Sequence, residues 1–165
     1  MIVEPLTRKA FRPFGTVLEM DGVERRLINN GTTERFHALA TVDVETERGK
    51  TIISLFRGQP RPFPYQVGMM EYHPLGSQAF YPLQDHHWLV IVAEDENGRP
   101  GHPRVFLASG RQGVQYDRHV WHHPLVALDA VSNFLIIDRE GPGNNLVEAD
   151  YPEPFLIEAA RITDR

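Results

Sequence analysis

One stretch of the chain reads Met70-Glu71-Tyr72-His73-Pro74-Leu75-Gly76-Ser77-Gln78-Ala79-Phe80. If the residues before Pro74 form a β-strand, Glu71 and His73 lie on the same face of it, because alternate residues of a strand share a face. A turn from Pro74 to Ser77 then reverses the chain, and Gln78 begins the return strand. The stretch therefore predicts two strands that bring three polar side chains to one pocket.

Short apolar segments of the same kind recur along the whole chain. Thirteen glycines and thirteen prolines separate them and are spread through the sequence instead of gathering in a linker. Short runs of β-branched and aromatic residues between turn signals indicate strands, and many such runs indicate a sandwich or a barrel. A polar connection from Asp95 to Gly101 joins two of them as a hairpin. We therefore expect an all-β fold. The runs are Thr51–Phe56, Val67–Tyr72, Gln78–Pro82, His87–Val92, Arg104–Leu107 and Phe134–Asp138.

Helical signals are few and local. Thr7 can cap a short helix that ends at Phe11. A second helical turn is expected within residues 32–39. The segment Phe155–Ile162 fits a short helix and an edge strand equally well. The expected fold thus contains only a few short helices.

The length and composition of the chain exclude several classes of protein and of functional site. The chain has 165 residues, enough for one domain with its own core, and we expect a single domain over residues 1–165. Its 17 basic and 22 acidic side chains leave a net charge of -5, which argues against nucleic acid or an anionic membrane as a partner. The absence of cysteine excludes disulfides, thiolate metal sites and cysteine nucleophiles. The run Trp88–Ala93 is too short to span a membrane, and residues 1–14 lack the apolar run of a secretory signal, so a cytoplasmic protein is expected.

A second polar segment, Tyr116 to Leu125, contains His122. Together the two polar segments resemble the cupin barrel, whose first motif pairs two histidines one residue apart with a later glutamate, and whose second motif adds a third histidine. Glu71, His73 and Gln78 stand at the places of the first motif, and His122 stands at the place of the third histidine. The resemblance implies a cupin-type double-stranded β-helix (jelly-roll) barrel in which these four residues bind a divalent metal. One carboxylate and two imidazoles remain a workable ligand set, whereas a glutamine oxygen is a poor ligand for a transition metal.

The other histidines are expected to lie outside this pocket. His86 and His87 follow Asp85 in what reads as a solvated loop. His123 alternates with His122 and should face the opposite way, toward a partner or the surface. Surface positions are expected for His102 and His119.

Further segments, taken together, resemble the ureidoglycolate lyase family. The most specific is Tyr116-x-Arg118-x-Val120-Trp121-His122-His123-Pro124-Leu125. The others are Ile28-Asn29-Asn30-Gly31, Arg35 with His37, Ile53-Ser54 leading to Arg57 and Gln59-Pro60, Glu71-x-His73-Pro74-Leu75-Gly76 with Gln78-Ala79-Phe80, Gly113-Val114, Phe134-Leu135 and Ile137-Asp138-Arg139. The resemblance runs from about the first ten residues to about residue 150. It implies a homodimeric lyase that splits (S)-ureidoglycolate into glyoxylate and urea in allantoin and purine degradation. Nickel is the favoured metal, zinc and manganese stay open, and no nucleotide cofactor is expected.

This reaction assigns roles to the pocket residues. The substrate hydroxyl must lose a proton and the departing nitrogen must gain one, so we expect Glu71 or His73 as the base and His122 as the acid. The substrate carboxylate needs a cation, and arginine offers a bidentate fit. Arg57 and Arg118 are the candidates, and Arg57 is preferred because it follows a strand lined with apolar residues. Tyr116 and Asn29 are expected to hold the ureido group. The predicted substrate-binding residues are Asn29, Arg57, Gln78, Tyr116 and Arg118.

Three alternatives stay open. Glu71 and His73 can form an ordinary hydrogen-bonded pair, with Gln78 satisfying a turn. Their placement with His122 at cupin spacing favours a functional pocket over this interpretation. A different cupin metalloenzyme, such as a dioxygenase or an isomerase, is the second alternative. A non-catalytic cupin that senses a small carboxylate is the third.

Overall fold

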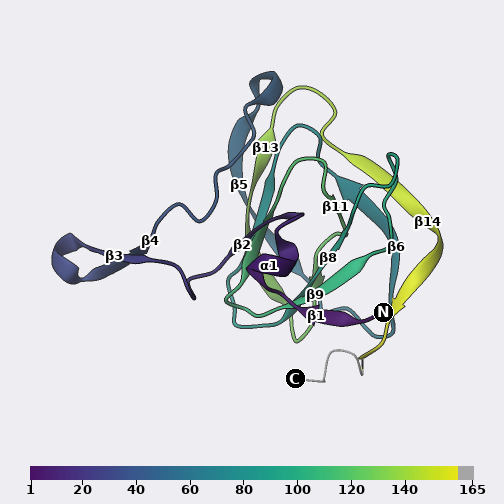
Figure 1. Ribbon diagram of the computed structural model, residues 1–165, viewed down its shortest axis with the longest axis horizontal. Coiled ribbons are helices and arrows are strands. Elements are labelled where there is room, and N and C mark those ends of the chain that lie inside the picture. Colours follow the sequence, from purple (N-terminus) through teal and green to yellow (C-terminus); the bar gives the residue numbers. More distant parts are fainter. Residues whose placement is uncertain (160–165) are drawn as a thin grey trace.

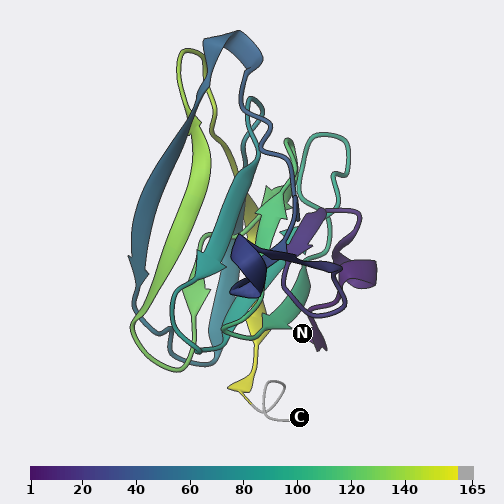
Figure 2. The ribbon, with the colours of Figure 1, turned by 90° about the vertical axis from the view of Figure 1, so that its left-hand side faces the viewer.

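The computed structural model describes residues 1–159. Two β-sheets curl around a common interior and face each other (Figure 1, Figure 2). The larger sheet has seven strands, in the order β1 (Val3–Pro5), β9 (Arg104–Ala108), β8 (Trp88–Ala93), β11 (Trp121–His122), β6 (Tyr65–Tyr72) and β14 (Val147–Ile157), with β12 (Val126–Ala127) pairing with β8. The smaller sheet has five, in the order β2 (Gly15–Leu18), β10 (Gly113–Tyr116), β7 (Gln78–Pro82), β13 (Ser132–Glu140) and β5 (Lys50–Gly58).

Two strands stand apart from these sheets. β3 (Arg25–Ile28) and β4 (Thr33–Phe36) form a separate hairpin, joined by the 3₁₀ turn η1 (Asn29–Gly31). The hairpin projects away from the two sheets (Figure 1). Every pairing between the named strands is antiparallel except that of β1 with β9. The all-β prediction is confirmed, and the two curled sheets agree with a cupin-type jelly roll.

The core between the sheets is apolar. Trp88, Val90 and Val92 of β8 pack there with side chains of the five-stranded sheet, while the alternate residues of β8 join a second cluster on the other face of the same sheet. A strand that is buried on both faces needs a continuous apolar run instead of an alternating one. The run from Trp88 to Ala93 meets this requirement, and all six apolar runs expected as strands lie in strands or begin one residue before them.

The short helix near the N-terminus is confirmed. α1 (Arg8–Phe11) begins after Thr7, whose Oγ1 accepts a hydrogen bond from the Ala10 N–H at 3.2 Å. Its single buried residue, Phe11, packs into the core between the sheets. The cap therefore orients one apolar side chain that helps to close this end of the barrel.

Two other local predictions have different outcomes. The helical turn expected within residues 32–39 is wrong, because Thr33–Phe36 forms β4 and exchanges backbone hydrogen bonds with β3. The segment Phe155–Ile162 is a strand as far as Ile157, and its last three residues lie outside the described part of the chain. A second 3₁₀ turn, η2 (Thr46–Arg48), precedes β5. None of the helices within residues 1–159 is both long and apolar enough to cross a membrane.

The turn after His73 connects two different sheets, whereas the sequence predicted a turn back to a neighbouring return strand. β6 belongs to the seven-stranded sheet and β7 to the five-stranded sheet, so the chain crosses between the sheets here instead of folding back on the same one. Gly76 permits this crossing, since a Cβ at its position would lie 2.8 Å from the Cβ of Arg139. Both strands border the interior, and Gln78 therefore still lies near His73.

Candidate active site

A row of polar side chains crosses three strands of the larger sheet. In the strand register, Glu71 of β6 lies opposite His122 of β11 on one side and opposite Glu148 of β14 on the other. Directly opposed residues on neighbouring strands share a face and have side chains in contact range. Pairing between strands far apart in the sequence thus brings two carboxylates and an imidazole together.

Three of the expected residues offer ligand atoms around one point. The ligand atoms of Glu71, His73 and His122 all lie within 4.8 Å of one another. Glu71 Oε1 is 3.6 Å from His122 Nε2, and the two imidazole centroids are 5.2 Å apart. A carboxylate and two imidazoles at this spacing form a donor set that suits a divalent transition metal.

Backbone carbonyls orient both imidazoles toward that point. His73 Nδ1 lies 2.7 Å from the Asn145 carbonyl oxygen, and His122 Nδ1 lies 2.8 Å from the Val120 carbonyl oxygen. A carbonyl only accepts, so each Nδ1 carries the hydrogen and each Nε2 presents a lone pair to the cluster. His122 Nε2 is buried and has no hydrogen-bond partner among residues 1–159. Metal-binding histidines are held in this way by a second-shell acceptor, so the residues fit a metal.

Gln78 adds an oxygen to the same cluster. Its Oε1 lies 3.1 Å from His73 Nε2, and its Nε2 donates to Asp138 Oδ2 at 3.4 Å. An amide oxygen and an imidazole lone pair repel each other at this distance unless a proton or a metal ion lies against both. Burial raises the pKa of Asp138, and the Gln78 hydrogen bond and the nearby His73 oppose that rise.

The electrostatics distinguish Glu71 from His122. Burial raises the pKa of Glu71, His73 opposes the rise, and Glu148 reinforces it. Burial, with a further contribution from His73, lowers the pKa of His122 to about 3. A neutral His122 has no proton on Nε2 to give, so the acid role expected for it does not fit this environment. Glu71, half-buried with a raised pKa, suits proton transfer better.

Glu71 and Gln78 of the cluster line a pocket of about 600 Å³. Glu71, Gln78 and Phe80 form its inner wall, and two exposed arginines, Arg57 and Arg61, lie on its rim. Volumes in this range are typical of small-molecule sites.

Arg57 lies at the pocket but faces partly away from it. It alternates with Phe56, whose ring packs against Phe80 inside the barrel, so the Arg57 side chain leaves β5 on the outer face. Its Nε donates to Asn133 Oδ1 at 2.9 Å. Arg61 was not among the residues predicted from the sequence. It lies in the proline-rich loop after β5, and this loop forms part of the pocket rim.

Three expected substrate contacts lie elsewhere. Arg118 forms an ion pair with Asp43, with Nε 2.8 Å from Oδ2, and lines a separate depression. Tyr116 is buried, and its ring stacks on His122 with centroids 4.3 Å apart and planes 10° apart, so it supports that imidazole and does not line the pocket. Asn29 lies in η1, the turn of the β3–β4 hairpin, and does not line the pocket.

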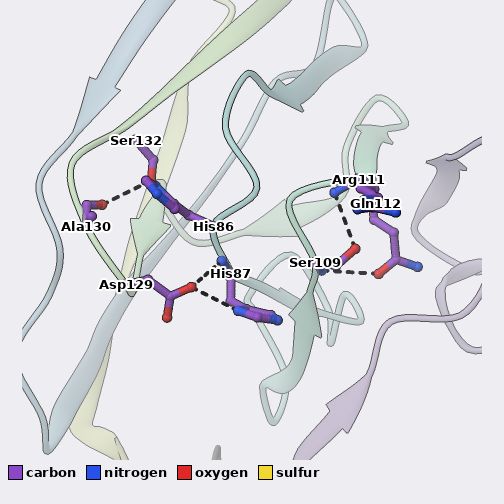
Figure 3. A network of polar contacts seen from close by, with 8 residues as sticks. All are labelled: His86, His87, Ser109, Arg111, Gln112, Asp129, Ala130 and Ser132. Atoms are coloured by element: carbon purple, nitrogen blue, oxygen red, sulfur yellow. Dashed lines mark hydrogen bonds and ion pairs between the residues drawn. The ribbon is translucent and has the colours of Figure 1, made fainter.

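The remaining histidines lie outside the cluster. His86 and His87 are in a loop as expected, but both are half-buried and engaged: His86 Nδ1 lies 3.0 Å from Ser132 Oγ, and His87 Nδ1 lies 2.9 Å from Asp129 Oδ2 (Figure 3). His123 faces away from the cluster and packs edge-on against Tyr65. His102 and His119 are exposed, as predicted.

Comparison with known proteins gives a consistent result. The family described as ureidoglycolate lyase matches residues 1–158. A protein of Rhizobium meliloti (strain 1021) named ureidoglycolate lyase 1 is 64% identical over 155 residues, which cover 94% of this chain and 91% of the relative. Proteins named ureidoglycolate lyase from Rhizobium etli (strain CIAT 652) and Agrobacterium fabrum are 61% and 56% identical, each over 94% of this chain and 93% of the relative. With a match that spans almost its whole length, the chain belongs to the ureidoglycolate lyase family.

Proposed function

We propose that this protein is a lyase that cleaves (S)-ureidoglycolate into glyoxylate and urea during allantoin degradation. The observation that carries the proposal is family membership over residues 1–158. The cluster of Glu71, His73 and His122 at a pocket supports it, because the reaction needs a proton acceptor beside bound substrate. The other-cupin and sensor alternatives have no comparable observation in their favour.

Glu71 is the proton carrier in this proposal. As a carboxylate it takes the proton from the substrate hydroxyl, whose oxygen becomes the aldehyde oxygen of glyoxylate. The carbon–nitrogen bond breaks, and the acid form of Glu71 returns the proton to the departing nitrogen of urea. One proton moves and none is consumed, so a single carboxylate can serve both steps through one of its two oxygens.

A divalent metal belongs to the same proposal, with nickel favoured and zinc or manganese as alternatives. His73 Nε2, His122 Nε2 and one oxygen of Glu71 would hold it, and Gln78 Oε1 lies beside them. A bound divalent ion lowers the pKa of a coordinated hydroxyl and polarises the group it holds. The neutral His122 acts here as a ligand and not as an acid.

The substrate carboxylate is proposed to bind at the arginine side of the pocket. Arg57 and Arg61 supply positive charge on the rim, and Phe56 and Phe80 form an apolar wall beneath them. Arginine binds a carboxylate through two parallel hydrogen bonds, which also fixes its orientation. We favour Arg61, because the Arg57 Nε already donates to Asn133.

The proposal also covers the domain number, the location and the oligomeric state of the protein. We infer that the chain works as one domain in the cytoplasm and as a homodimer. Two large apolar side chains on the outer face of β5, Ile53 and Leu55, are 70% and 69% exposed. They lie directly opposite Ile137 and Leu135 of β13, so the exposed apolar surface is continuous across two strands. Contiguous exposed apolar surface of this kind is typical of protein–protein interfaces.

The test is glyoxylate release from (S)-ureidoglycolate by purified protein, measured before and after removal of metal with a chelator. Release with urea as co-product is the expected result, with loss of activity after stripping and recovery on addition of nickel. Undiminished release after stripping would remove the metal from the proposal. An absence of release under every metal condition would overturn the lyase, and stabilisation by ureidoglycolate without turnover would favour the sensor.

A further inference from the structure

Asp138 places a carboxyl group beside the apolar core. It lies on β13 with Phe134 and Ile136, which are both buried in the core between the sheets. Its Oδ1 is buried and has no hydrogen-bond partner within residues 1–159, and none of the ion pairs found there involves it. A carboxylate in such surroundings is costly, which calls for an explanation beyond packing.

The hydrogen bond that Asp138 accepts determines which way the Gln78 amide faces. A carboxylate only accepts hydrogen bonds, so the amide must turn its Nε2 toward Asp138 Oδ2, at 3.4 Å. The amide oxygen then necessarily points the other way, to 3.1 Å from His73 Nε2. With no acceptor behind it, the amide would turn its NH₂ toward His73 Nε2 instead, because that nitrogen is itself an acceptor once Nδ1 holds the hydrogen.

We propose that Asp138 is a positioning residue, which holds the Gln78 amide with its oxygen toward the cluster so that Gln78 becomes a fourth donor to the metal of Glu71, His73 and His122. The inference rests on the proposed function, because it requires that the cluster binds a divalent ion. Glutamine differs from glutamate in this respect. A glutamate offers an oxygen whichever way it turns, whereas a glutamine offers one only when its neighbour fixes the amide.

A double-mutant cycle separates orientation from charge. Asp138→Asn keeps the size of the side chain but supplies an NH₂ group that can bind the Gln78 oxygen and so reverse the amide. Gln78→Glu removes the need for orientation. The loss of negative charge at position 138 acts in both backgrounds, whereas the loss of orientation acts only where Gln78 is present.

The probe is NiCl₂ titrated calorimetrically into chelator-stripped protein. With Gln78 present, Asp138→Asn is expected to weaken nickel binding about 10–100-fold, the range typical of second-shell partners. With Gln78→Glu present, the same change should cost little or should improve binding, because two neighbouring carboxylates no longer repel. The control is Ser132→Ala, which removes a buried hydroxyl at the other end of β13 and should leave nickel affinity unchanged. Thermal unfolding of each stripped variant shows that it folds.

Each other outcome counts against the inference. An equal loss of affinity in both backgrounds would reduce Asp138 to a source of charge, and unchanged affinity in Asp138→Asn would overturn its role altogether. Wild-type protein that binds no nickel, and that keeps its lyase activity after stripping, would overturn the metal part of the proposed function and this inference with it. Failure of the inference alone leaves wild-type binding intact, so the two failures are distinguishable.

Discussion

Glu71 stands between a neutral imidazole on β11 and a second carboxylate on β14. Desolvation and Glu148 both disfavour its charged form, and His73 favours it. The balance raises the pKa of Glu71 above its ordinary value, so its acid form persists to higher pH than that of a free glutamate. Burial, His73 and Glu148 therefore adjust the proton affinity of the one group that the proposed chemistry uses.

Replacing Glu71 tests this role directly. Glu71→Gln keeps the shape of the side chain but can carry no proton, so kcat is expected to fall by about 10²–10⁴-fold, the usual contribution of general acid–base catalysis. The matched control is Asp150→Asn, an exposed carboxylate further along β14 that does not act on Glu71, which should keep its activity. Both are assayed by glyoxylate release, with the nickel content of each protein determined alongside. Near-normal kcat in metal-loaded Glu71→Gln would exclude Glu71 as the proton carrier.

His122 makes folding sensitive to acid. Burial lowers the pKa of the His122 ring from its ordinary value of 6.5 to about 3. Between these two pH values the ring is protonated in the unfolded chain and neutral in the folded chain. The stabilising contribution is complete above pH 6.5 and is lost as the pH falls toward 3, because the unfolded state then binds more protons.

Urea unfolding of metal-free protein measures this contribution. Between pH 7 and about pH 5, wild type is expected to lose about 2 kcal/mol more stability than His122→Gln, at about 1.4 kcal/mol per pH unit below 6.5. The carboxyl groups whose pKa is raised, and His123, whose pKa is lowered, are present in both proteins. Their contributions to the pH dependence therefore cancel in the comparison. Parallel stability curves for the two proteins would mean that the His122 ring is accessible to protons in the fold.

At the scale of elements, the connection between β13 and β14 supports the turn between β6 and β7. Asn145 lies in this connection and accepts two hydrogen bonds from the β6–β7 turn. Its backbone oxygen lies 2.7 Å from His73 Nδ1, and its Oδ1 accepts from the Leu75 N–H at 2.8 Å. One residue thus anchors both the imidazole and the backbone that follows it. Residues that are 70 or more positions apart in the sequence share this anchor.

Asn145→Ala should therefore affect both folding and metal binding. It leaves the Leu75 N–H without its acceptor, which costs about 1–3 kcal/mol of stability where the group is shielded from water, and it loosens the loop that orients His73. We expect lower stability in urea and weaker nickel binding in calorimetry. Asn144→Ala is the control, because Asn144 is exposed and bonds only within its own loop. Wild-type nickel affinity in a destabilised Asn145→Ala protein would show that the connection supports the fold without orienting His73.

The features predictable from the sequence are those set by local geometry. Strand alternation placed Glu71 and His73 on one face, and the short turn after His73 placed Gln78 near them. The resemblance to the cupin barrel, and not local geometry, placed His122 in the same cluster. Partners that only the fold brings together could not be predicted. The ion pair of Arg118 with Asp43 is an example, as is the register that sets Glu148 beside Glu71.

β4 shows the same limit for secondary structure. Its sequence, Thr33 to Phe36, is compatible with a helical turn, and only its pairing with β3 makes it a strand. The sheet switch after His73 likewise depends on which strands β6 and β7 meet, which local turn signals do not specify. Local signals thus gave the kind and spacing of the elements, while long-range pairing decided their partners.

For the whole molecule, the outer face of β5 and β13 is the surface that the proposed homodimer would bury. β5 is an edge strand of its sheet, and Ile53 and Leu55 extend the apolar surface of β13 to that edge. Water-exposed apolar side chains contribute about 25 cal/mol for each Å² that an interface buries, so a second copy on this face would gain from covering them. A two-fold arrangement would use the same strands from both copies.

Leu55→Glu should therefore break the proposed homodimer. A charge at the centre of the apolar face would be desolvated on association without a counter-ion, whereas in the separate chain it stays in water and leaves the fold intact. Sedimentation velocity at micromolar concentration is expected to show a dimer for wild type and a monomer for Leu55→Glu. Ile2→Glu is the control, because Ile2 is 75% exposed and lies outside this face, and it should sediment like wild type. A monomeric wild type would remove the dimer from the proposal, and a dimeric Leu55→Glu would move the interface to another surface.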